Sequence, residues 1–345
     1  MDLVLDEAFV TRADPSDPVL WPFLPETNIQ YAWDSTSLGL FKQCPRLYQY
    51  IMIDGWASQD ESVHLRFGID YHKALQDYDI IRTSAAHDDA VRETVHQTLI
   101  RTADWTPDTD TKAGKYKNRT TLIRTVCDYL DHFASDPATT YVLEDGSPAV
   151  ELSFRFELDW GPMAGGTPYL LSGHLDRVVS FNDELFVMDR KTTTTTPGSY
   201  YFNQFEPNNQ MTLYTLASQI VLKSPIKGVI IDAAQILIDS SRFVRGFTYR
   251  TPEQLQEWTD DLGSILSIAE SYAEAGYWPM NDTACDKFGG CRFREICSKS
   301  PQVREQFLKA RFTKQEPEDR WNPLKARGWL MPLLTGLITI QSMVC

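Results

Sequence analysis

The first part of the chain carries the apolar spacing of amphipathic helices. From Ser35, apolar side chains recur on one face of the segment STSLGLFKQCPRLYQYIMI, with Pro45 as a kink or a restart. The same spacing predicts a helix over 63–81 and two more over 86–103 and 118–134. These helices make up the predicted helical N-terminal portion of the fold.

Between the last two of these helices lies the polar segment TPDTDTKAGKYKNRTT, which gathers four basic residues: Lys112, Lys115, Lys117 and Arg119. One interpretation is a solvated loop. The other is a loop that contacts a nucleic-acid backbone, because cations on phosphates supply most of the affinity for nucleic acid.

Further along, hydrophobic and polar residues alternate, as they do in half-buried strands. The alternating segments are ELSFRFEL (151–158), HLDRVVSF (174–181) and ELFVMDRK (184–191). Asn182-Asp183 separates the last two, and both residue types tolerate the backbone of a tight hairpin turn. The pattern then predicts, in order, a helix over 207–222, an apolar run over 228–238, a strand over 242–249 and a helix that begins at Thr251-Pro252-Glu253. This succession of elements predicts an α/β fold.

The predicted hairpin brings charged side chains together. If its strands pair across the two-residue turn, Asp176 faces Asp189 and His174 faces Lys191. Opposed carboxylates repel each other, whereas a bound divalent cation turns them into ligands. Lys191 lies two residues from Asp189 and so shares its face, where it can orient a water or neutralise charge on a phosphate. The alternative is a pair of strand-end aspartates beside a solvated lysine.

Charge and targeting signals narrow the range of partners. The 345 residues include 33 Lys and Arg against 47 Asp and Glu, a formal charge of −14. This balance disfavours non-specific nucleic-acid binding, although a local basic stripe can track a strand. No signal peptide and no membrane span is predicted, so we expect a cytoplasmic protein with reduced or metal-bound cysteines. The apolar tail 329–345 is short and contains Pro332; we expect it to pack as a helix or strand or to be frayed.

Four short motifs together resemble a known family. GHLDRVV (173–179) and VMDRKTT (187–193) are similar to the G-x-x-D-R and D-x-K-T signatures of RecB-like nucleases in the PD-(D/E)XK superfamily. GIDYHKAL (68–75) is similar to the upstream G-x-x-x-H helix of these nucleases, and QMTLY (210–214) to their Q-x-x-x-Y motif. The resemblance runs from about Ser35 to Ser300. It implies a central mixed β-sheet flanked by helices, the restriction-endonuclease-like core.

The resemblance also implies a reaction and its residues. His72, Asp176 and Asp189 would hold Mg²⁺ or Mn²⁺, and Lys191 would position the attacking water. Gln210 and Tyr214 are four residues apart, on one helix face, and would support the site. The alternative is that Tyr214 packs as ordinary core. Two further groups allow two interpretations each. Glu151 is either an additional acid of the site or an exposed strand residue. The threonines at 192–196 either supply hydroxyls to a phosphate or form a polar connecting loop.

The expected activity is metal-dependent hydrolysis of DNA, as an exonuclease acting on single strands or at ends, in recombination, repair or phage DNA processing. The chain carries no G-x-x-x-x-G-K-[ST] motif, so a separate helicase or recombination protein is the expected partner, and no membrane is. The alternatives are a non-catalytic nucleic-acid-binding or assembly subunit that keeps the nuclease fold, and a structural protein held together by zinc.

A second metal centre is predicted from cysteines. Cys285, Cys291 and Cys297 follow a C-x5-C-x5-C spacing, and Gly289-Gly290 allows a tight turn between them. With Cys44 they resemble the layout of AddB-like nucleases, in which one N-terminal and three C-terminal cysteines hold a [4Fe-4S] cluster. The spacing is wider than in that family, which leaves open Zn²⁺ and a set without Cys285.

Five regions follow from these patterns. They are an irregular arm (1–34), a helical portion with Cys44 and His72 (35–145), the nuclease core (146–280), the cysteine segment (281–300) and the tail (301–345).

Overall fold

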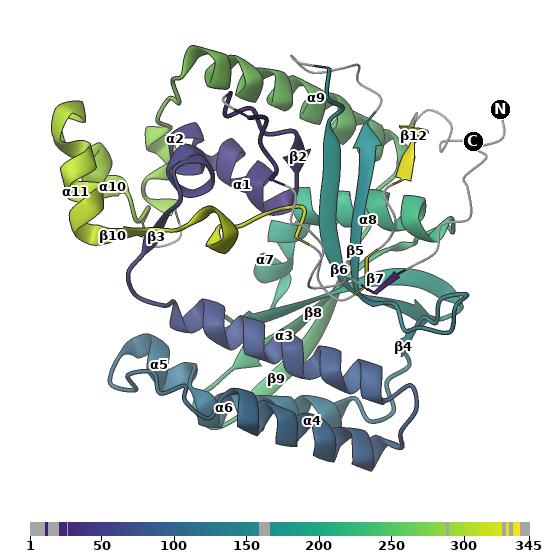
Figure 1. Cartoon of the computed structure of the whole chain (residues 1–345). Helices are drawn as coiled ribbons and strands as arrows, with labels where there is room; N and C mark the ends of the chain where they lie inside the picture. The colour runs from purple at the N-terminus through teal and green to yellow at the C-terminus, as the bar shows by residue number, and fades with distance from the viewer. Residues whose placement is uncertain are drawn as a thin grey trace.

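The fold is built on one mixed sheet (Figure 1). The computed structural model describes residues 11–12, 21–25, 27–158, 166–287, 290–325, 329–330 and 334–338. The strands of the sheet lie side by side in the order β1 (Thr11–Arg12), β11 (Trp329–Leu330), β5 (Val150–Leu158), β6 (Leu170–Phe181), β7 (Glu184–Thr193), β8 (Gly228–Ile236) and β9 (Ser241–Thr248). Neighbouring strands from β5 to β9 are antiparallel, except that β7 and β8 are parallel. The prediction of a central mixed sheet is therefore confirmed.

Short strands from the N-terminal part, the middle and the C-terminal part of the chain extend this sheet. β2 (Ala32–Trp33) and β4 (Thr139–Thr140) pair with β6, and β12 (Leu334–Ile338) pairs with β5. The described parts of the predicted tail are thus strands, whereas Pro332 and Cys345 lie outside the described residues. A separate pair, β3 (Trp56–Ser58) and β10 (Phe312–Lys314), joins a segment near α2 to the C-terminal part.

Helices cover both faces of the sheet. In chain order they are α1 (Ser35–Gln43), α2 (Pro45–Tyr48), α3 (Val63–Ile81), α4 (His87–Arg101), α5 (Lys112–Tyr116), α6 (Arg119–His132), α7 (Ser199–Phe202), α8 (Asn209–Leu222), α9 (Pro252–Ala275), α10 (Arg294–Cys297) and α11 (Arg304–Arg311). Of these, α3, α4, α6, α8 and the start of α9 lie close to the predicted bounds. No helix in the described ranges is long and apolar enough to cross a membrane.

Local sequence explains where these helices begin and end. Pro45 opens α2 after the extended Cys44, which is the predicted restart. Thr251 caps α9 through a capping box with Gln254, because each side chain accepts a hydrogen bond from the other's backbone N–H. Gly276 ends α9 in the left-handed conformation that glycine adopts without strain.

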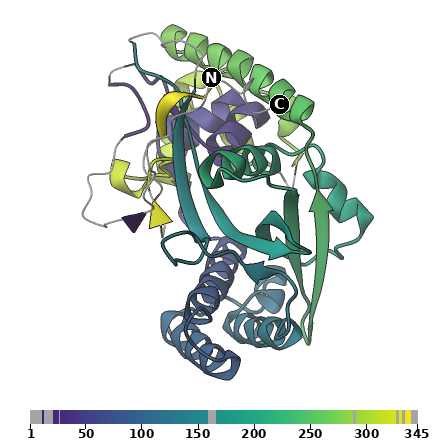
Figure 2. The same cartoon turned by 90° about the vertical axis from the view of Figure 1, so that its right-hand side faces the viewer.

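The strand β8 shows how the two helical layers are separated. Val229 and Ile231 belong to the core that includes α1, α8 and α9, whereas Ala234 and Ile236 belong to the core under α3 and α6. Alternate residues of a strand point to opposite faces, so α3 and α6 cover one face and α8 covers the other. Figure 2, turned by 90°, shows the same two layers from the side.

The predicted hairpin forms with the predicted register. Asn182 and Asp183 take positive φ angles of 51° and 62°, as a tight two-residue turn between antiparallel strands requires. The pairing runs from Phe181 opposite Glu184 to Arg177 opposite Met188. This part of the sequence interpretation is confirmed.

Beyond Arg177 and Met188 the two strands separate. β6 continues back to Leu170 beside β5, and β7 continues to Thr193 beside β8. Figure 1 shows β5 and β6 rising through the upper part of the molecule while β7, β8 and β9 run behind α3. We call the space between the separating strands the fork. It opens directly after the last paired residues, at Asp176 and Asp189.

The predicted polar loop contains a short helix, α5, which ends at Tyr116. Lys112 and Lys115 are exposed, but Lys117 is buried, with 4% of its surface accessible. The interpretation of this segment as a solvated loop is therefore wrong for Lys117, whose burial depends on contacts with distant parts of the chain.

Candidate active site at the fork

The first side of the site joins β6 to the helix α3. The Oδ2 atom of Asp176 accepts a hydrogen bond from the backbone N–H of Arg190 at 3.1 Å, which ties it to β7 across the fork. The same oxygen lies 3.2 Å from Nδ1 of His72 on α3. The structure thus brings together the predicted histidine and both predicted aspartate positions, although they come from segments about 100 residues apart.

The second side joins β7 to α8. Lys191 Nζ donates a hydrogen bond to Asp189 Oδ1 at 2.8 Å and another to Gln210 Oε1 at 3.1 Å. Gln210 Nε2 in turn donates to the hydroxyl of Tyr214 at 2.9 Å. Lys191 shares the face of Asp189, and Gln210 and Tyr214 share one face of α8, as predicted.

The two carboxylates have opposite protonation tendencies. Burial would raise the pKa of Asp176, but His72, Lys191 and the N–H of Arg190 together hold that pKa well below its usual value. Burial raises the pKa of Asp189 to about 6 and the neighbouring charge of Asp176 adds to the rise, while Lys191 opposes it. Burial lowers the pKa of His72, but Asp176 outweighs burial, so the net shift is upward. The two carboxylates therefore differ in charge at mildly acidic pH, where Asp189 is protonated and Asp176 is not, and both are mainly ionised at neutral pH.

The donor atoms suit a hard divalent cation. Two carboxylates and an imidazole are ligands that Mg²⁺ or Mn²⁺ accepts. Asp189 is 1% exposed, and its Oδ2 atom, 2.7 Å from Lys191 Nζ, accepts no hydrogen bond from the described residues. Across the described ranges, no three His, Cys, Asp or Glu side chains are already arranged around one point as ligands. The donors fit the cation in kind, and the carboxylates are turned toward Lys191 and His72.

Glu151 lies beside Asp176 on the neighbouring strand β5. Its neighbours Val150 and Leu152 pair with Arg177 and Leu175, so Glu151 is level with Asp176. Its φ angle of 51° is rare for a residue with a side chain and interrupts the strand at this point. Glu151 also helps to raise the pKa of Tyr214, after burial, Asp176 and Asp189, which places its charge near the site. The interpretation of Glu151 as a further site acid stays a prediction.

The predicted pairing of His174 with Lys191 is wrong. His174 pairs with Ser153 on β5 instead, and its Nδ1 lies 2.9 Å from the Ser153 hydroxyl. The cause is the fork, since β6 has already left β7 at this position.

An ion cluster beneath the fork was not expected from the sequence. Asp79 on α3 lies 2.6 Å from Arg190 and 3.6 Å from Arg177, and all three side chains are buried. Arg177 directly follows Asp176, and Arg190 directly follows Asp189. One buried carboxylate thus binds the residue after each site aspartate, and the same helix carries His72. The one feature of the sequence that could have indicated this cluster is the Asp-Arg dipeptide, which occurs in both strands.

A second neighbour that the sequence did not suggest is Tyr201 on α7. Burial raises its pKa to about 12, and the charge of Asp189 contributes to the rise. Its half-buried phenol therefore lies close to that carboxylate.

The glycine of the predicted G-x-x-x-H motif faces the site without packing tightly. A Cβ atom on Gly68 would lie 3.9 Å from Thr192 Oγ1, an ordinary contact, and would meet no closer atom. The chain's own packing therefore does not require glycine here, and the room it leaves lies beside the threonine that follows Lys191.

The four predicted cysteines converge at a second place. Cys44, Cys285, Cys291 and Cys297 all line one small cavity between the start of α2 and the C-terminal segment. Asn281 connects the two parts, donating from its backbone N–H to Cys44 Sγ and from its side chain to the carbonyl of Gln43. Burial raises the pKa values of the Cys285 and Cys297 thiols. As at the fork, the described cysteines are not arranged as a set of ligands around one ion.

Residues 33–298 match the family model described as the PD-(D/E)XK nuclease superfamily. The matched range includes the fork, α3, α8 and all four converging cysteines. The chain belongs to the PD-(D/E)XK nuclease superfamily. The core of this superfamily, a mixed sheet with helices on both sides, is the fold described above.

Solved structures similar to this superfamily member are distant from it in sequence. One is the "Putative exonuclease" of Eubacterium rectale, with 9% identity, a TM-score of 0.45, and coverage of 80% of this chain and 92% of that one. Another is the protein SSO0001, with 12% identity, a TM-score of 0.27, and coverage of 67% and 74%. No curated protein matches the chain.

Proposed function

We propose that this PD-(D/E)XK superfamily member is a Mg²⁺- or Mn²⁺-dependent nuclease that hydrolyses DNA phosphodiester bonds at the fork. The observation that carries the proposal is the convergence of Asp176, Asp189 and Lys191 with His72, in a superfamily whose activity is nucleolytic. His72, Asp176 and Asp189 would hold the cation, which when bound would lower the pKa of a water and polarise the phosphate.

Each of the side chains that converge at the fork has a role in this proposal. The Lys191 ammonium, oriented by Asp189 and Gln210, is positioned to hold the attacking water and to offset negative charge on the phosphate. Gln210 keeps its amide oxygen toward Lys191 because Tyr214 accepts from its amide nitrogen. Glu151 adds negative charge on the β5 side, where a further cation ligand would be useful.

The proposed substrate is a DNA end or a single strand, and the proposed activity is exonucleolytic. A separate helicase or recombination protein would supply any opening of duplex DNA, since the sequence has no phosphate-binding motor motif.

We also propose that Cys44, Cys285, Cys291 and Cys297 hold a [4Fe-4S] cluster, with Zn²⁺ as the alternative. Their convergence on one cavity, between segments about 240 residues apart, supports a structural metal centre. Arg46 and Arg304 lie close enough to Cys297 to lower its pKa against the larger effect of burial, and they would offset the charge of thiolates.

Cleavage of end-labelled DNA tests the activity and the type of substrate together. Linear single strands, linear duplexes and covalently closed circles are incubated with Mg²⁺, with Mn²⁺ or with EDTA. Loss of label from linear DNA, with circles left intact and no loss in EDTA, is the expected result. Cleavage of closed circles would contradict the exonuclease assignment, and cleavage in EDTA would contradict metal dependence.

A further inference from the structure

Lys117 is a buried cation that has no carboxylate partner among the residues that the structure describes. Its side chain is 4% exposed, its Nζ donates to Thr192 Oγ1 at 3.0 Å, and it lies 5.2 Å from the centre of the Phe67 ring. None of the ion pairs between described residues includes Lys117. Burial alone lowers its pKa to about 8, with no carboxylate to counter the shift.

Such an arrangement is unfavourable within the protein itself. A buried charge normally has an ionic partner, because an unpaired one loses its hydration without compensation. Arg190, also buried, has Asp79 at 2.6 Å. Among the described residues, Lys117 Nζ contacts a hydroxyl and an aromatic face, so its charge is left to be neutralised by an anion from outside the chain.

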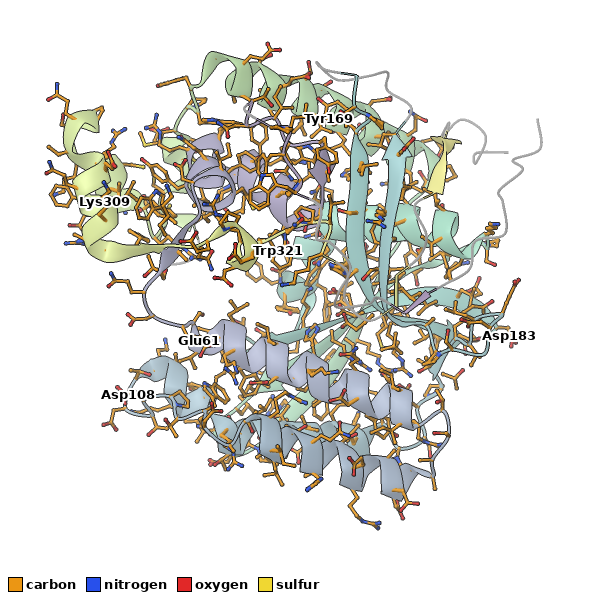
Figure 3. All side chains as sticks on the ribbon, in the orientation of Figure 1. Glu61, Asp108, Tyr169, Asp183, Lys309 and Trp321 are labelled. Atoms are coloured by element: carbon orange, nitrogen blue, oxygen red, sulfur yellow. The ribbon has the colours of Figure 1, made fainter. Side chains whose placement is uncertain are left out.

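The position of Lys117 near the proposed active site indicates which anion it would meet. Thr192 directly follows Lys191 on β7, and successive strand residues point to opposite faces. The Lys117 ammonium therefore lies at the level of the proposed catalytic lysine but on the α3 side of the sheet, whereas Lys191 contacts Gln210 on the α8 side. Gly68 leaves open space beside the same hydroxyl, four residues before His72 on α3. Figure 3 shows Glu61, just ahead of α3, and Asp108, ahead of α5, at the same end of this helical layer.

We propose that the Lys117 ammonium and the Thr192 hydroxyl bind a backbone phosphate of the DNA strand, on the α3 side of the fork and away from the phosphate that is cleaved. This rests on the proposed function. One cation and one neutral donor match the single negative charge of a phosphodiester better than the higher charge of free phosphate. The adjoining surface suits a strand with unpaired bases, because Leu65 and Ile69 on the same part of α3 are 63% and 56% exposed.

The test is DNA binding by Lys117→Met in a protein that also carries Asp189→Asn, which prevents the proposed cleavage. Binding of a fluorescent single-stranded oligonucleotide is measured by anisotropy in Mg²⁺ over a range of salt concentrations. We expect Kd to rise roughly tenfold, the range of a lost charge-assisted hydrogen bond. We expect the slope of log K against log salt to fall by about 0.7, the value for one phosphate contact on a single strand.

Two variants serve as controls. Lys309→Met removes the same charge from the exposed surface of α11, labelled in Figure 3, and should leave Kd and the slope unchanged. Thr192→Val keeps Lys117 and should weaken binding by less than Lys117→Met, which preserves the test if the methionine variant does not fold. Unchanged Kd and slope in both site variants would overturn the proposal.

Two further outcomes separate this proposal from others. If the site variants weaken binding of inorganic phosphate, measured by calorimetry, but not of DNA, the subsite takes a free anion and the DNA assignment is wrong. If the otherwise unaltered protein cleaves no DNA while Lys117→Met still weakens DNA binding, the nuclease proposal fails and the phosphate subsite stands. Cleavage together with unaltered binding by Lys117→Met would instead overturn the subsite alone.

Discussion

Asp189 combines deep burial with a carboxylate oxygen that accepts no hydrogen bond from the described residues. Its pKa of about 6 in the folded protein lies above the ordinary value of 3.8. A folded-state pKa that is raised means that the folded protein binds the proton more tightly than the unfolded chain. The stability that this proton supplies is full below about pH 4 and is lost as the pH rises through 6.

Asp189→Asn should therefore stabilise the metal-free protein at pH 7 and have little effect at pH 4, because asparagine imitates the protonated acid. Thermal unfolding in EDTA at the two pH values measures this difference. A lower melting temperature for the variant at pH 7 would contradict the account, since it would mean that the Lys191 ion pair outweighs the burial of the charge.

Lys117 presents the reverse case, a base whose pKa is lowered by burial from 10.5 to about 8. Below pH 8 the buried ammonium destabilises the fold, and the effect disappears as the pH rises from 8 to 10.5 and the folded protein releases the proton first. Lys117→Met should raise the free energy of unfolding at pH 7 by up to about 3 kcal/mol, less the lost hydrogen bond to Thr192.

Urea unfolding at pH 7 and pH 10 checks this prediction, with Lys309→Met as the control that should change little at either pH. A loss of stability in Lys117→Met at pH 7 would show that the lysine is structural. It would also remove the main argument for an external anion.

At the scale of elements, the helix α3 connects the two strands of the fork through its side chains. Asp79 lies two turns from His72 on this helix and binds Arg177 of β6 and Arg190 of β7. It therefore holds the two strands at the point where they separate, and with them the residues before each arginine, Asp176 and Asp189.

Asp79→Asn should lower the free energy of unfolding by about 3–5 kcal/mol, because two buried arginines lose their shared counter-ion. The exposed Asp89, which pairs with Arg92 on α4, offers the matched control; Asp89→Asn should change stability by less than about 1 kcal/mol. Chemical denaturation of both variants measures the difference. Equal losses of stability in the two variants would mean that the ion cluster of Asp79 with the two arginines does not stabilise the fold.

Most elements could be predicted from the sequence because their signals are local. The helix over 63–81 and the hairpin turn at Asn182-Asp183 follow from apolar spacing and turn residues, and the structure has both at the predicted positions. The fork could not be predicted in this way. Local pattern pairs His174 with Lys191, whereas the separation of β6 from β7 depends on which neighbours, β5 or β8, each strand follows.

The candidate site divides in the same manner. The pairs Asp189–Lys191 and Gln210–Tyr214 are close in sequence, so strand and helix periodicity could predict their shared faces. The Lys117–Thr192 and Asp79–Arg190 contacts join residues 75 and 111 positions apart. No periodic pattern predicts contacts of that kind, and only the packing of the helical layer on the sheet reveals them.

At the scale of the whole molecule, the cysteine cavity joins the N-terminal helices to the segment after α9. A metal centre there would close a loop that contains most of the chain. It would stabilise the fold because it restricts the conformations open to the unfolded chain. Purified protein should contain about four iron atoms and absorb visible light, or one zinc ion if zinc is the native metal.

Cys44→Ser should remove that metal and lower the melting temperature, whereas Cys127→Ser, a change on α6 away from the cavity, should do neither. Elemental analysis and thermal unfolding of the two variants provide the comparison. A metal-free protein with wild-type stability in Cys44→Ser would contradict a structural role for the centre.

The central claim, that the fork cleaves DNA, is tested most directly by matched substitutions on one hairpin. Asp189→Asn and Lys191→Met change the fork, and Asp183→Asn changes the exposed hairpin tip labelled in Figure 3, where asparagine tolerates the same backbone conformation. With linear DNA and Mg²⁺ or Mn²⁺, the account predicts loss of cleavage by at least a hundredfold in both fork variants and unchanged cleavage in Asp183→Asn. Cleavage that survives both fork substitutions, or a folded wild type that cleaves nothing, would contradict it.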